Sequence, residues 1–128
     1  MLTREKLTDA QWNAIRTAPH LVMLAVSAAG GTPFEEWRER EAGLRGISDA
    51  INSSNPLLQA IADSVQIVEA EEEVRAWYYT LPDAERTHSS LQARALGSAQ
   101  VALDAVRSQG SAEDLVQYGD FILGTAMR

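Results

Sequence analysis

Proline and glycine divide this chain into short segments, and that division constrains the fold more than any other feature of the sequence. Proline lacks a backbone N–H group, so it is tolerated in the first turn of a helix but interrupts a helix interior. Glycine is favoured just after a helix ends. Between these residues, apolar side chains recur every three or four positions, which predicts amphipathic helices. The dividing residues are Pro19, Gly30, Gly31, Pro33, Pro56, Pro82 and Gly110.

Several of these divisions carry residues that cap a helix start. Thr8 and Gln11 have the spacing of a capping box, in which a hydroxyl and an amide side chain satisfy free backbone N–H groups. Asn55 precedes Pro56, which is a cap followed by proline at the first helical position. The helix starts predicted from such signals lie at residues 9, 33, 56 and 112.

The segment over 19–29 is apolar on nearly every side. A helix of that kind belongs in the centre of a bundle. Because Pro19 cannot donate a backbone hydrogen bond, we expect the first helix to stop or kink just before it and a second helix to follow. Beyond these, the spacing predicts helices from 33 to 51, from 56 to 77 or 79, from 83 to 109 and from 112 onward.

The whole pattern predicts an all-α protein. No alternating run of apolar and polar residues indicates a strand. The connections are short, which makes consecutive helices antiparallel neighbours. We therefore expect residues 1–128 to form one domain, a five- or six-helix bundle around the apolar helix over 19–29.

Charge and cysteine content exclude several classes of function. The net charge is −7, whereas a nucleic-acid-binding protein or an anionic membrane surface requires a basic face. The chain has no cysteine, which removes disulfides, thiolate nucleophiles and cysteine metal sites. The apolar run over 18–29 is too short to span a membrane, and acidic residues before it argue against a secretory signal. We expect a cytoplasmic protein.

No catalytic motif is evident. The imidazoles are His20 and His88, and neither lies beside a nucleophile in a recognised arrangement. We expect His20 to lie near the start of a helix, exposed or bound to a carboxylate. Ser89 and Ser90 adjoin His88, but neighbours in sequence point in different directions on a helix. The sequence therefore favours a protein that is not an enzyme.

One pair of residues has the spacing of metal ligands. Glu85 and His88 form a Glu-x-x-His unit, which on a helix places a carboxylate and an imidazole on one face. Di-iron bundles use two such units with further glutamates, and only one is present here. The alternative is an ordinary pair on a helix surface.

Two acidic runs, 35–41 and 69–73, are expected to be solvated helix faces, because carboxylates on a helix splay outward rather than converge on a cation. Trp12, Trp37 and Trp77 fall near the apolar stripes of their helices, where packing is the ordinary role. A small-molecule pocket between helices stays open as an alternative.

The last predicted helix reaches the end of the sequence without a stop signal. Its apolar face is expected to comprise Leu115, Ile122, Leu123 and Ala126. If that face lacks a partner in the chain, it is exposed, and exposed apolar patches usually mark association. We therefore expect a protein partner or self-association through residues 115–127.

The first third of the chain resembles the TerB-like (tellurite-resistance) family. The resemblance covers roughly residues 10–45 and rests on Trp12, Ile15, Ala18-Pro19, Ala28-Ala29-Gly30 and Glu36. It implies an all-helical fold, a stress-response setting in bacteria and a divalent metal at the turn near Gly30, where Glu36 matches the family's glutamate. Glu35, next to it in the sequence, is a further candidate ligand. The family often has aspartate where this chain has Ala29, which departs from the metal-binding pattern.

Two hypotheses of function follow. The first is a non-enzymatic bacterial helical domain, similar to TerB-like proteins, that acts through protein–protein contacts and holds no cofactor. The alternative is a divalent-metal-binding helical protein, with its site at the Gly30 turn or at Glu85 and His88.

Overall fold

The structure is a computed structural model that describes residues 2–29 and 44–126. Within these two ranges it is an all-α helical bundle without strands, which confirms the predicted fold class. The predicted turn at Gly30 and the helix start at Pro33 lie outside the described residues. The elements are the short 3₁₀ helix η1 (Arg4–Lys6), α1 (Asp9–Ala29), a helix over 44–49, η2 (Ala50–Asn52), α3 (Pro56–Ile61), α4 (Ser64–Thr80), η3 (Asp83–Glu85), α5 (His88–Gln109) and α6 (Ala112–Ala126).

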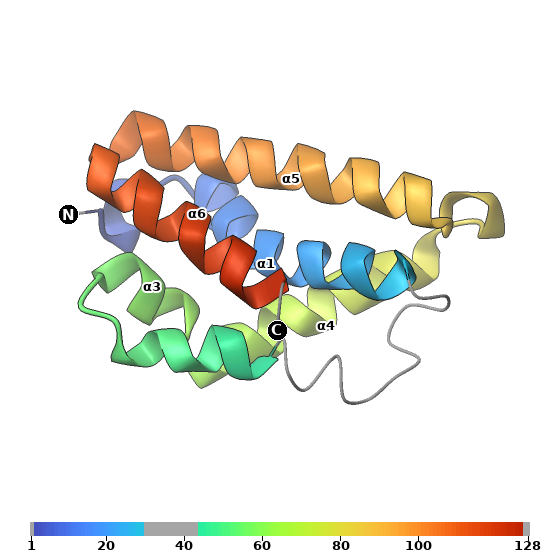
Figure 1. The fold of residues 1–128 in the computed structure, drawn as a ribbon, viewed down its shortest axis with the longest axis horizontal. Coiled ribbons are helices and arrows are strands. Elements are labelled where there is room, and N and C mark those ends of the chain that lie inside the picture. Colours follow the sequence, from blue (N-terminus) through green and yellow to red (C-terminus); the bar gives the residue numbers. More distant parts are fainter. Residues whose placement is uncertain (1, 30–43, 127–128) are drawn as a thin grey trace.

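Helix α1 lies in the centre of the bundle (Figure 1), as the apolar character of its second half predicts. Helix α5 runs antiparallel along α1, and α4 and α6 pack against α1 as well. Burial of these apolar side chains is the main favourable contribution to folding. The buried apolar residues that α1 contributes are Trp12, Ile15, Ala18, Met23, Leu24 and Ala25.

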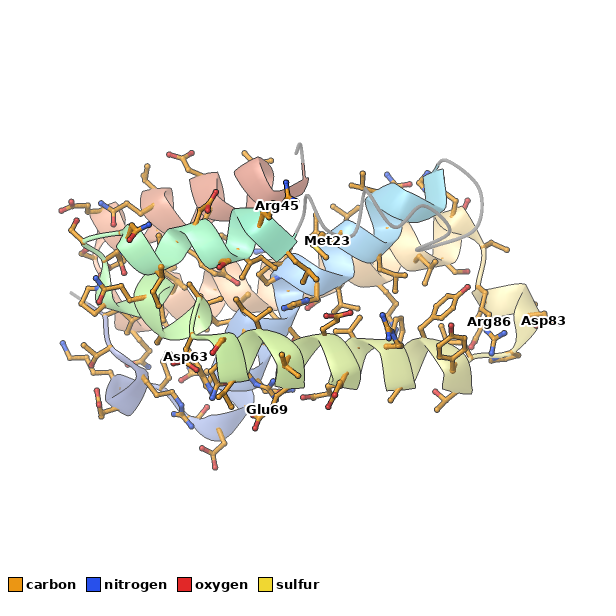
Figure 2. The ribbon with its side chains drawn as sticks, turned by 90° about the horizontal axis from the view of Figure 1, so that it is seen from below. Met23, Arg45, Asp63, Glu69, Asp83 and Arg86 are labelled. Atoms are coloured by element: carbon orange, nitrogen blue, oxygen red, sulfur yellow. The ribbon has the colours of Figure 1, made fainter. Side chains whose placement is uncertain are left out.

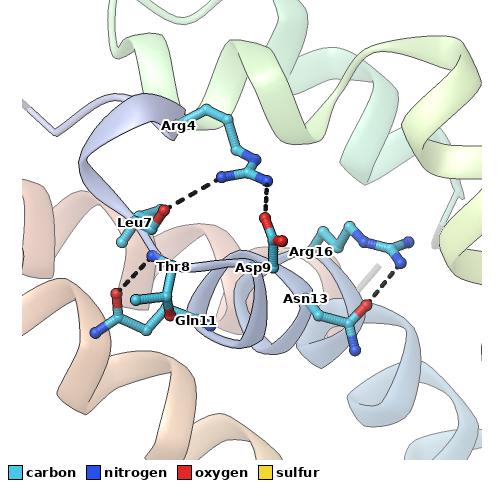
Figure 3. Close-up of polar contacts among 7 residues, drawn as sticks. All are labelled: Arg4, Leu7, Thr8, Asp9, Gln11, Asn13 and Arg16. Atoms are coloured by element: carbon cyan, nitrogen blue, oxygen red, sulfur yellow. Dashed lines mark hydrogen bonds and ion pairs between the residues drawn. The ribbon is translucent and has the colours of Figure 1, made fainter.

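The predicted helix caps are present. The backbone N–H of Gln11 donates to the Thr8 hydroxyl at 3.1 Å. In return, the backbone N–H of Thr8 donates to the Gln11 amide oxygen at 3.0 Å, the bond that Figure 3 draws between these two residues. The Asn55 side-chain oxygen accepts from the backbone N–H of Leu57 at 2.9 Å. Each cap satisfies backbone donors that the first helical turn leaves free, and so each fixes where its helix begins.

The predicted end of the first helix before Pro19, with a second helix after it, is wrong, because α1 extends from Asp9 to Ala29 with this proline inside it. In an α-helix the residue at position 19 would donate to the carbonyl of Ile15, and proline has no N–H group with which to do so. The hydroxyl of Tyr118, in α6, donates to that carbonyl instead, at 2.7 Å. The buried carbonyl is therefore satisfied, which removes one cost of keeping a proline in the helix.

The single helix predicted from 56 to 77 or 79 is two helices. Helix α3 ends at Ile61, and α4 begins at Ser64 and extends to Thr80. The Asp63 carboxylate caps α4 by accepting from the backbone N–H of Val65 at 3.0 Å. The apolar spacing of three to four residues continues across this break, which is why the spacing alone did not locate it.

The helix predicted to begin at Asp83 begins later. Residues Asp83–Glu85 form the 3₁₀ helix η3, and α5 starts at His88 after an N-cap at Thr87. The Thr87 hydroxyl accepts from the backbone N–H of Ser90 at 3.3 Å. Glu85 and His88 therefore belong to different elements.

Arg86 fixes the corner between α4 and α5. Its guanidinium donates to the carbonyl of Tyr79 at 2.9 Å and lies 5.3 Å from the centre of the Tyr78 ring. It also pairs with Asp83 at 3.6 Å, as Figure 2 shows at the end of α4. These contacts join the last turn of α4 to the segment before α5, and so they help to orient α5 relative to α4.

The face of α6 that packs on the bundle differs from the predicted one. The buried residues of α6 are Asp114, Tyr118 and Ile122, which lie four positions apart, while Leu115 is half-buried. Of the predicted apolar face, Leu123 is 61% exposed, and the side chain of Ala126 lies outside the described residues. The prediction was wrong because it did not assign Asp114 and Tyr118 to the buried face of the helix.

Asp114 is the centre of a buried hydrogen-bond network. Its carboxylate accepts from the backbone N–H and hydroxyl of Ser111, each at 3.0 Å. It also accepts from the backbone N–H of Leu2 at 3.0 Å and from the Asn55 amide at 3.1 Å. Burial acts to raise the pKa of this carboxyl, but the hydrogen bonds outweigh burial and hold the pKa below its ordinary value. One side chain thereby joins the N-terminal segment, the start of α3 and the start of α6.

His20 is buried in the interior, contrary to the prediction that it lies exposed or bound to a carboxylate near a helix start. Only 1% of its surface is accessible. Its Nδ1 atom has no hydrogen-bond partner among the residues that the structure describes. Burial, with a smaller effect from the charge of Arg16, lowers the pKa of His20 to about 4. The imidazole is therefore neutral at physiological pH.

Candidate binding groove

An open groove lies between α4 and α5, with α1 as its floor. Its volume is about 570 Å³, which is within the usual range for sites that hold small molecules or side chains of a partner. The groove exists because α4 and α5 each pack mainly on α1 rather than on each other. Its lining residues are Thr17, Leu21, Glu73, Val74, Trp77, Ala93, Arg94, Gly97, Ser98 and Val101.

Most of the lining is apolar or small, and part of it is exposed to solvent. Val101 is 57% exposed, although it lies on a helix whose opposite side is well packed. Trp77 is half-buried rather than part of the core, so its predicted packing role is confirmed only in part. Trp12 is buried as predicted, and Trp37 lies outside the described residues. The groove thus presents apolar surface that residues 2–29 and 44–126 leave uncovered.

Arg94 lies over the ring of Trp77 at one end of the groove. The guanidinium carbon is 5.5 Å from the ring centre, which is the geometry of a cation–π contact. A second hollow of about 330 Å³ continues beyond this pair. It is lined by Trp77, Leu81, Glu85, Ser90, Ala93 and Arg94. The stacked pair therefore stands between two adjoining hollows and contributes a positive charge to both.

The other polar groups of the groove are held by neighbouring residues. Glu73 forms an ion pair with Arg16 of α1, and Arg16 also donates to the Asn13 side chain at 2.6 Å. The Thr17 hydroxyl donates to the backbone carbonyl of Asn13 at 2.7 Å. Only the Arg16–Glu73 pair links the groove wall on α4 to its floor on α1, because the two contacts of Asn13 lie within α1. The Thr17 hydroxyl is engaged in a structural hydrogen bond of that helix.

Gly97 lies in the middle of α5 and faces the groove. A Cβ atom added at this position would meet no atom within 4 Å. A glycine inside a helix destabilises it relative to alanine, and packing among the described residues does not require one here. An isolated glycine in a helical pattern is a signal visible in the sequence, and it marks a position where another molecule can approach the backbone closely.

Of the four predicted metal ligands, the structure describes Glu85 and His88. Glu85 and His88 are both exposed, and they lie on η3 and α5 respectively, so the helical spacing that joined them does not apply. Glu85 lines the second hollow, and His88 does not. Glu35 and Glu36 lie outside the described residues. Within the described ranges, no group of three or more histidine, aspartate or glutamate residues converges on a common point.

The acidic run on α4 forms ion pairs at the surface. Glu71 pairs with Arg75 at 2.9 Å, Glu73 pairs with Arg16, and Glu69 and Glu72 are exposed. The prediction of a solvated face is confirmed for Glu69 and Glu72, whereas the side chain of Glu71 is only 12% exposed. The run over 35–41 lies outside the described residues. None of the helices described here is long and apolar enough to cross a membrane.

The sequence reading missed the groove and the burial of His20. The groove depends on how α4 and α5 are placed on α1, which is decided by contacts between residues distant in sequence. Gly97 is the one sequence signal for it. His20 lies next to Pro19, and its burial depends on α1 continuing through that proline. Comparison with known proteins found no similar family model, curated protein or solved structure.

Proposed function

We propose that this chain is a non-enzymatic helical binding domain that acts through protein–protein contacts, and that the groove between α4 and α5 is its binding surface. The resemblance of residues 10–45 to TerB-like proteins suggests a bacterial stress-response setting and a cytoplasmic location for this activity. The observation that carries the proposal is the groove itself, which leaves apolar surface uncovered beside a single stacked cation.

The shape and lining of the groove favour a partner helix or an extended apolar segment. Peptide helices commonly dock with their apolar side in a groove between two helices of the receptor. Small residues on the α5 wall, Ala93 and Gly97, let a partner backbone approach closely. Arg94 and Trp77 supply the kinds of side chain that dominate binding energy at protein interfaces.

The metal-binding alternative has no observation in its favour. Of its four candidate ligands, Glu35 and Glu36 lie outside the described residues, and Glu85 and His88 are exposed on separate elements. Two exposed side chains on different elements do not supply the converging ligands that a divalent cation requires.

Site-specific photo-crosslinking in living cells tests the proposal. A photoreactive phenylalanine derivative replaces Ala93, which lines the groove, or Gln92, which is exposed on the same helix and does not line it. We expect a covalent protein adduct from position 93 only. In a molecule that also carries Gly97→Phe, the added ring fills the groove and the adduct is lost.

Positions 92 and 93 are adjacent in the sequence and both are exposed, so nonspecific crosslinking should affect both equally. Adducts of equal yield from positions 92 and 93, or no adduct from position 93, would contradict the groove as a protein-binding surface. An adduct that Gly97→Phe does not reduce would contradict it as well.

A further inference from the structure

The outward side of α6 is an apolar ridge flanked by acidic residues. Glu113, Val116, Asp120 and Leu123 lie three or four positions apart and are all exposed, opposite the buried residues Asp114, Tyr118 and Ile122. Val116 and Leu123 are each 61% exposed. We call these four exposed residues the α6 ridge. No element in the described part of the chain covers them.

The groove and the α6 ridge complement each other in charge. Two charged residues line the groove. Glu73 is paired with Arg16, whereas Arg94 has no carboxylate partner among the described residues, so the uncompensated charge of the groove is positive. The ridge carries the negative charges of Glu113 and Asp120 beside its apolar side chains. An acidic residue that reached Arg94 would gain a charge-assisted hydrogen bond in partly apolar surroundings.

The two surfaces also match in length. Val116 and Leu123 are two helical turns apart, which is about 10 Å along the helix axis. The α5 wall of the groove extends from Ala93 to Val101, which is about 12 Å along its axis. Both apolar side chains of the ridge therefore fit within the groove at the same time.

We propose that a second copy of this chain docks its α6 ridge into the groove between α4 and α5. The proposal rests on the proposed function and names the partner at that surface. It revises the sequence-based expectation of self-association through residues 115–127, because the side of α6 that was expected to be free is partly buried in its own chain.

This contact is head-to-tail rather than symmetric. The groove is formed by α1, α4 and α5, and the ridge belongs to α6, so the two surfaces share no residue. When one ridge fills one groove, each pair of copies retains a free groove at one end and a free ridge at the other. Such contacts produce rings or open chains.

Complementary variants test this arrangement. Gly97→Phe fills the groove and leaves the ridge intact. Because a Cβ at this position has nothing within 4 Å of it among the described residues, we expect the fold to be retained. Leu123→Glu places a charge on the ridge and leaves the groove intact, and Leu123 is exposed, so the fold is retained here too. Circular dichroism of each variant checks that both remain helical.

Mass is measured by light scattering over a concentration series. The wild-type mass is expected to rise with concentration beyond that of a dimer, and each variant alone is expected to stay monomeric. An equimolar mixture of the two variants is expected to form a dimer and nothing larger, because it contains one intact groove and one intact ridge per pair. Arg94→Glu is expected to weaken wild-type association about tenfold, because it reverses the charge that faces the acidic ridge.

The outcomes separate this inference from the proposed function. A wild-type protein that stays monomeric at every concentration overturns the second copy as the partner, while crosslinking at position 93 still decides whether the groove binds another protein. A wild-type protein that associates, with variants whose mixture stays monomeric, overturns the ridge-to-groove geometry. A position-93 adduct with twice the mass of this chain supports both.

Discussion

Pro19 shows how one residue depends on another that is distant in sequence. Its missing N–H group leaves the carbonyl of Ile15 without the usual helical donor, and the Tyr118 hydroxyl supplies a donor from 103 positions away. Burial raises the pKa of Tyr118, so that the hydroxyl remains a hydrogen-bond donor at all ordinary pH values. A local rule about proline therefore fails here for a reason that only the tertiary structure contains.

This dependence predicts a coupled pair of substitutions. Tyr118→Phe leaves the buried Ile15 carbonyl without a donor, and we expect the free energy of unfolding to fall by about 1–3 kcal/mol. In a Pro19→Ala background the alanine N–H donates to Ile15, so the same substitution should cost much less. Urea unfolding of the four proteins gives the coupling energy. Equal losses in the two backgrounds would contradict the proposed compensation.

His20 predicts a dependence of stability on pH. In the unfolded chain its pKa is near 6.5, and burial lowers the folded value to about 4. Between these values the unfolded state binds more protons, so stability rises with pH across this window. The contribution of neutral His20 to the free energy of unfolding is complete above about pH 6.5. About 3 kcal/mol of it is lost as the pH falls to 4.

Urea unfolding of the wild type and of His20→Leu at pH 7.5 and pH 4.5 checks this expectation. The leucine variant should lose most of the difference between the two pH values. Asp114 affects stability in a lower pH range. Its lowered pKa adds to the free energy of unfolding above the ordinary carboxyl pKa, and this addition is lost as the pH falls through the lower pKa of the folded state. An unchanged pH dependence in His20→Leu would show that other groups cause it.

Asp114 predicts the largest effect of a single polar substitution. Asp114→Ala removes the acceptor for Leu2, Asn55 and Ser111 at once, and we expect a loss of about 2–4 kcal/mol in the free energy of unfolding. Asp120→Ala is a matched control on the exposed side of the same helix and should change stability by less than about 0.5 kcal/mol. Chemical denaturation measures both. Similar values for the two would contradict the role of the network.

At the scale of elements, the sequence predicted the features that local residues decide. The caps at Thr8 and Asn55 each use residues within three positions of one another, and their helices begin where expected. The break between α3 and α4 was missed because the cap at Asp63 lies inside an uninterrupted apolar pattern. The helix expected from Asp83 starts late because η3 and the Thr87 cap intervene. The groove was not predicted, because it depends on how α4 and α5 diverge across α1.

Glycine substitutions in and after α5 test how that helix uses its two glycines. Gly97→Ala should raise the free energy of unfolding by about 0.5–1 kcal/mol, because an added Cβ meets nothing within 4 Å and alanine is the better helix former. Gly110→Ala should be destabilising, because its Cβ would lie 2.9 Å from the Val106 carbonyl oxygen. Thermal melts of both variants decide this. A loss of stability in Gly97→Ala would show that packing within the chain requires the glycine.

At the scale of the whole molecule, a central helix supports two others that diverge across it. Helix α6 donates a hydrogen bond to the carbonyl that Pro19 leaves free in α1, and the Arg16–Glu73 pair links α4 to α1. This arrangement leaves an apolar groove with one stacked cation on an otherwise acidic protein. The residues that carry the TerB-like resemblance belong to α1 and to the segment that follows it, so the resemblance remains a hypothesis about context, separate from the groove.

Titration with 1-anilinonaphthalene-8-sulfonate, an anionic apolar dye, asks most directly whether the groove is a binding surface. We predict saturable binding of the dye at one site, with enhanced dye fluorescence and quenching of the fluorescence of Trp77. The Gly97→Phe variant is expected to lose that binding. Gly119→Phe is the matched control, since a Cβ added there on α6 also meets nothing within 4 Å, and it should bind the dye normally. Dye binding that is absent from the wild type, or that persists unchanged in Gly97→Phe, would contradict the groove as the place where this protein meets other molecules.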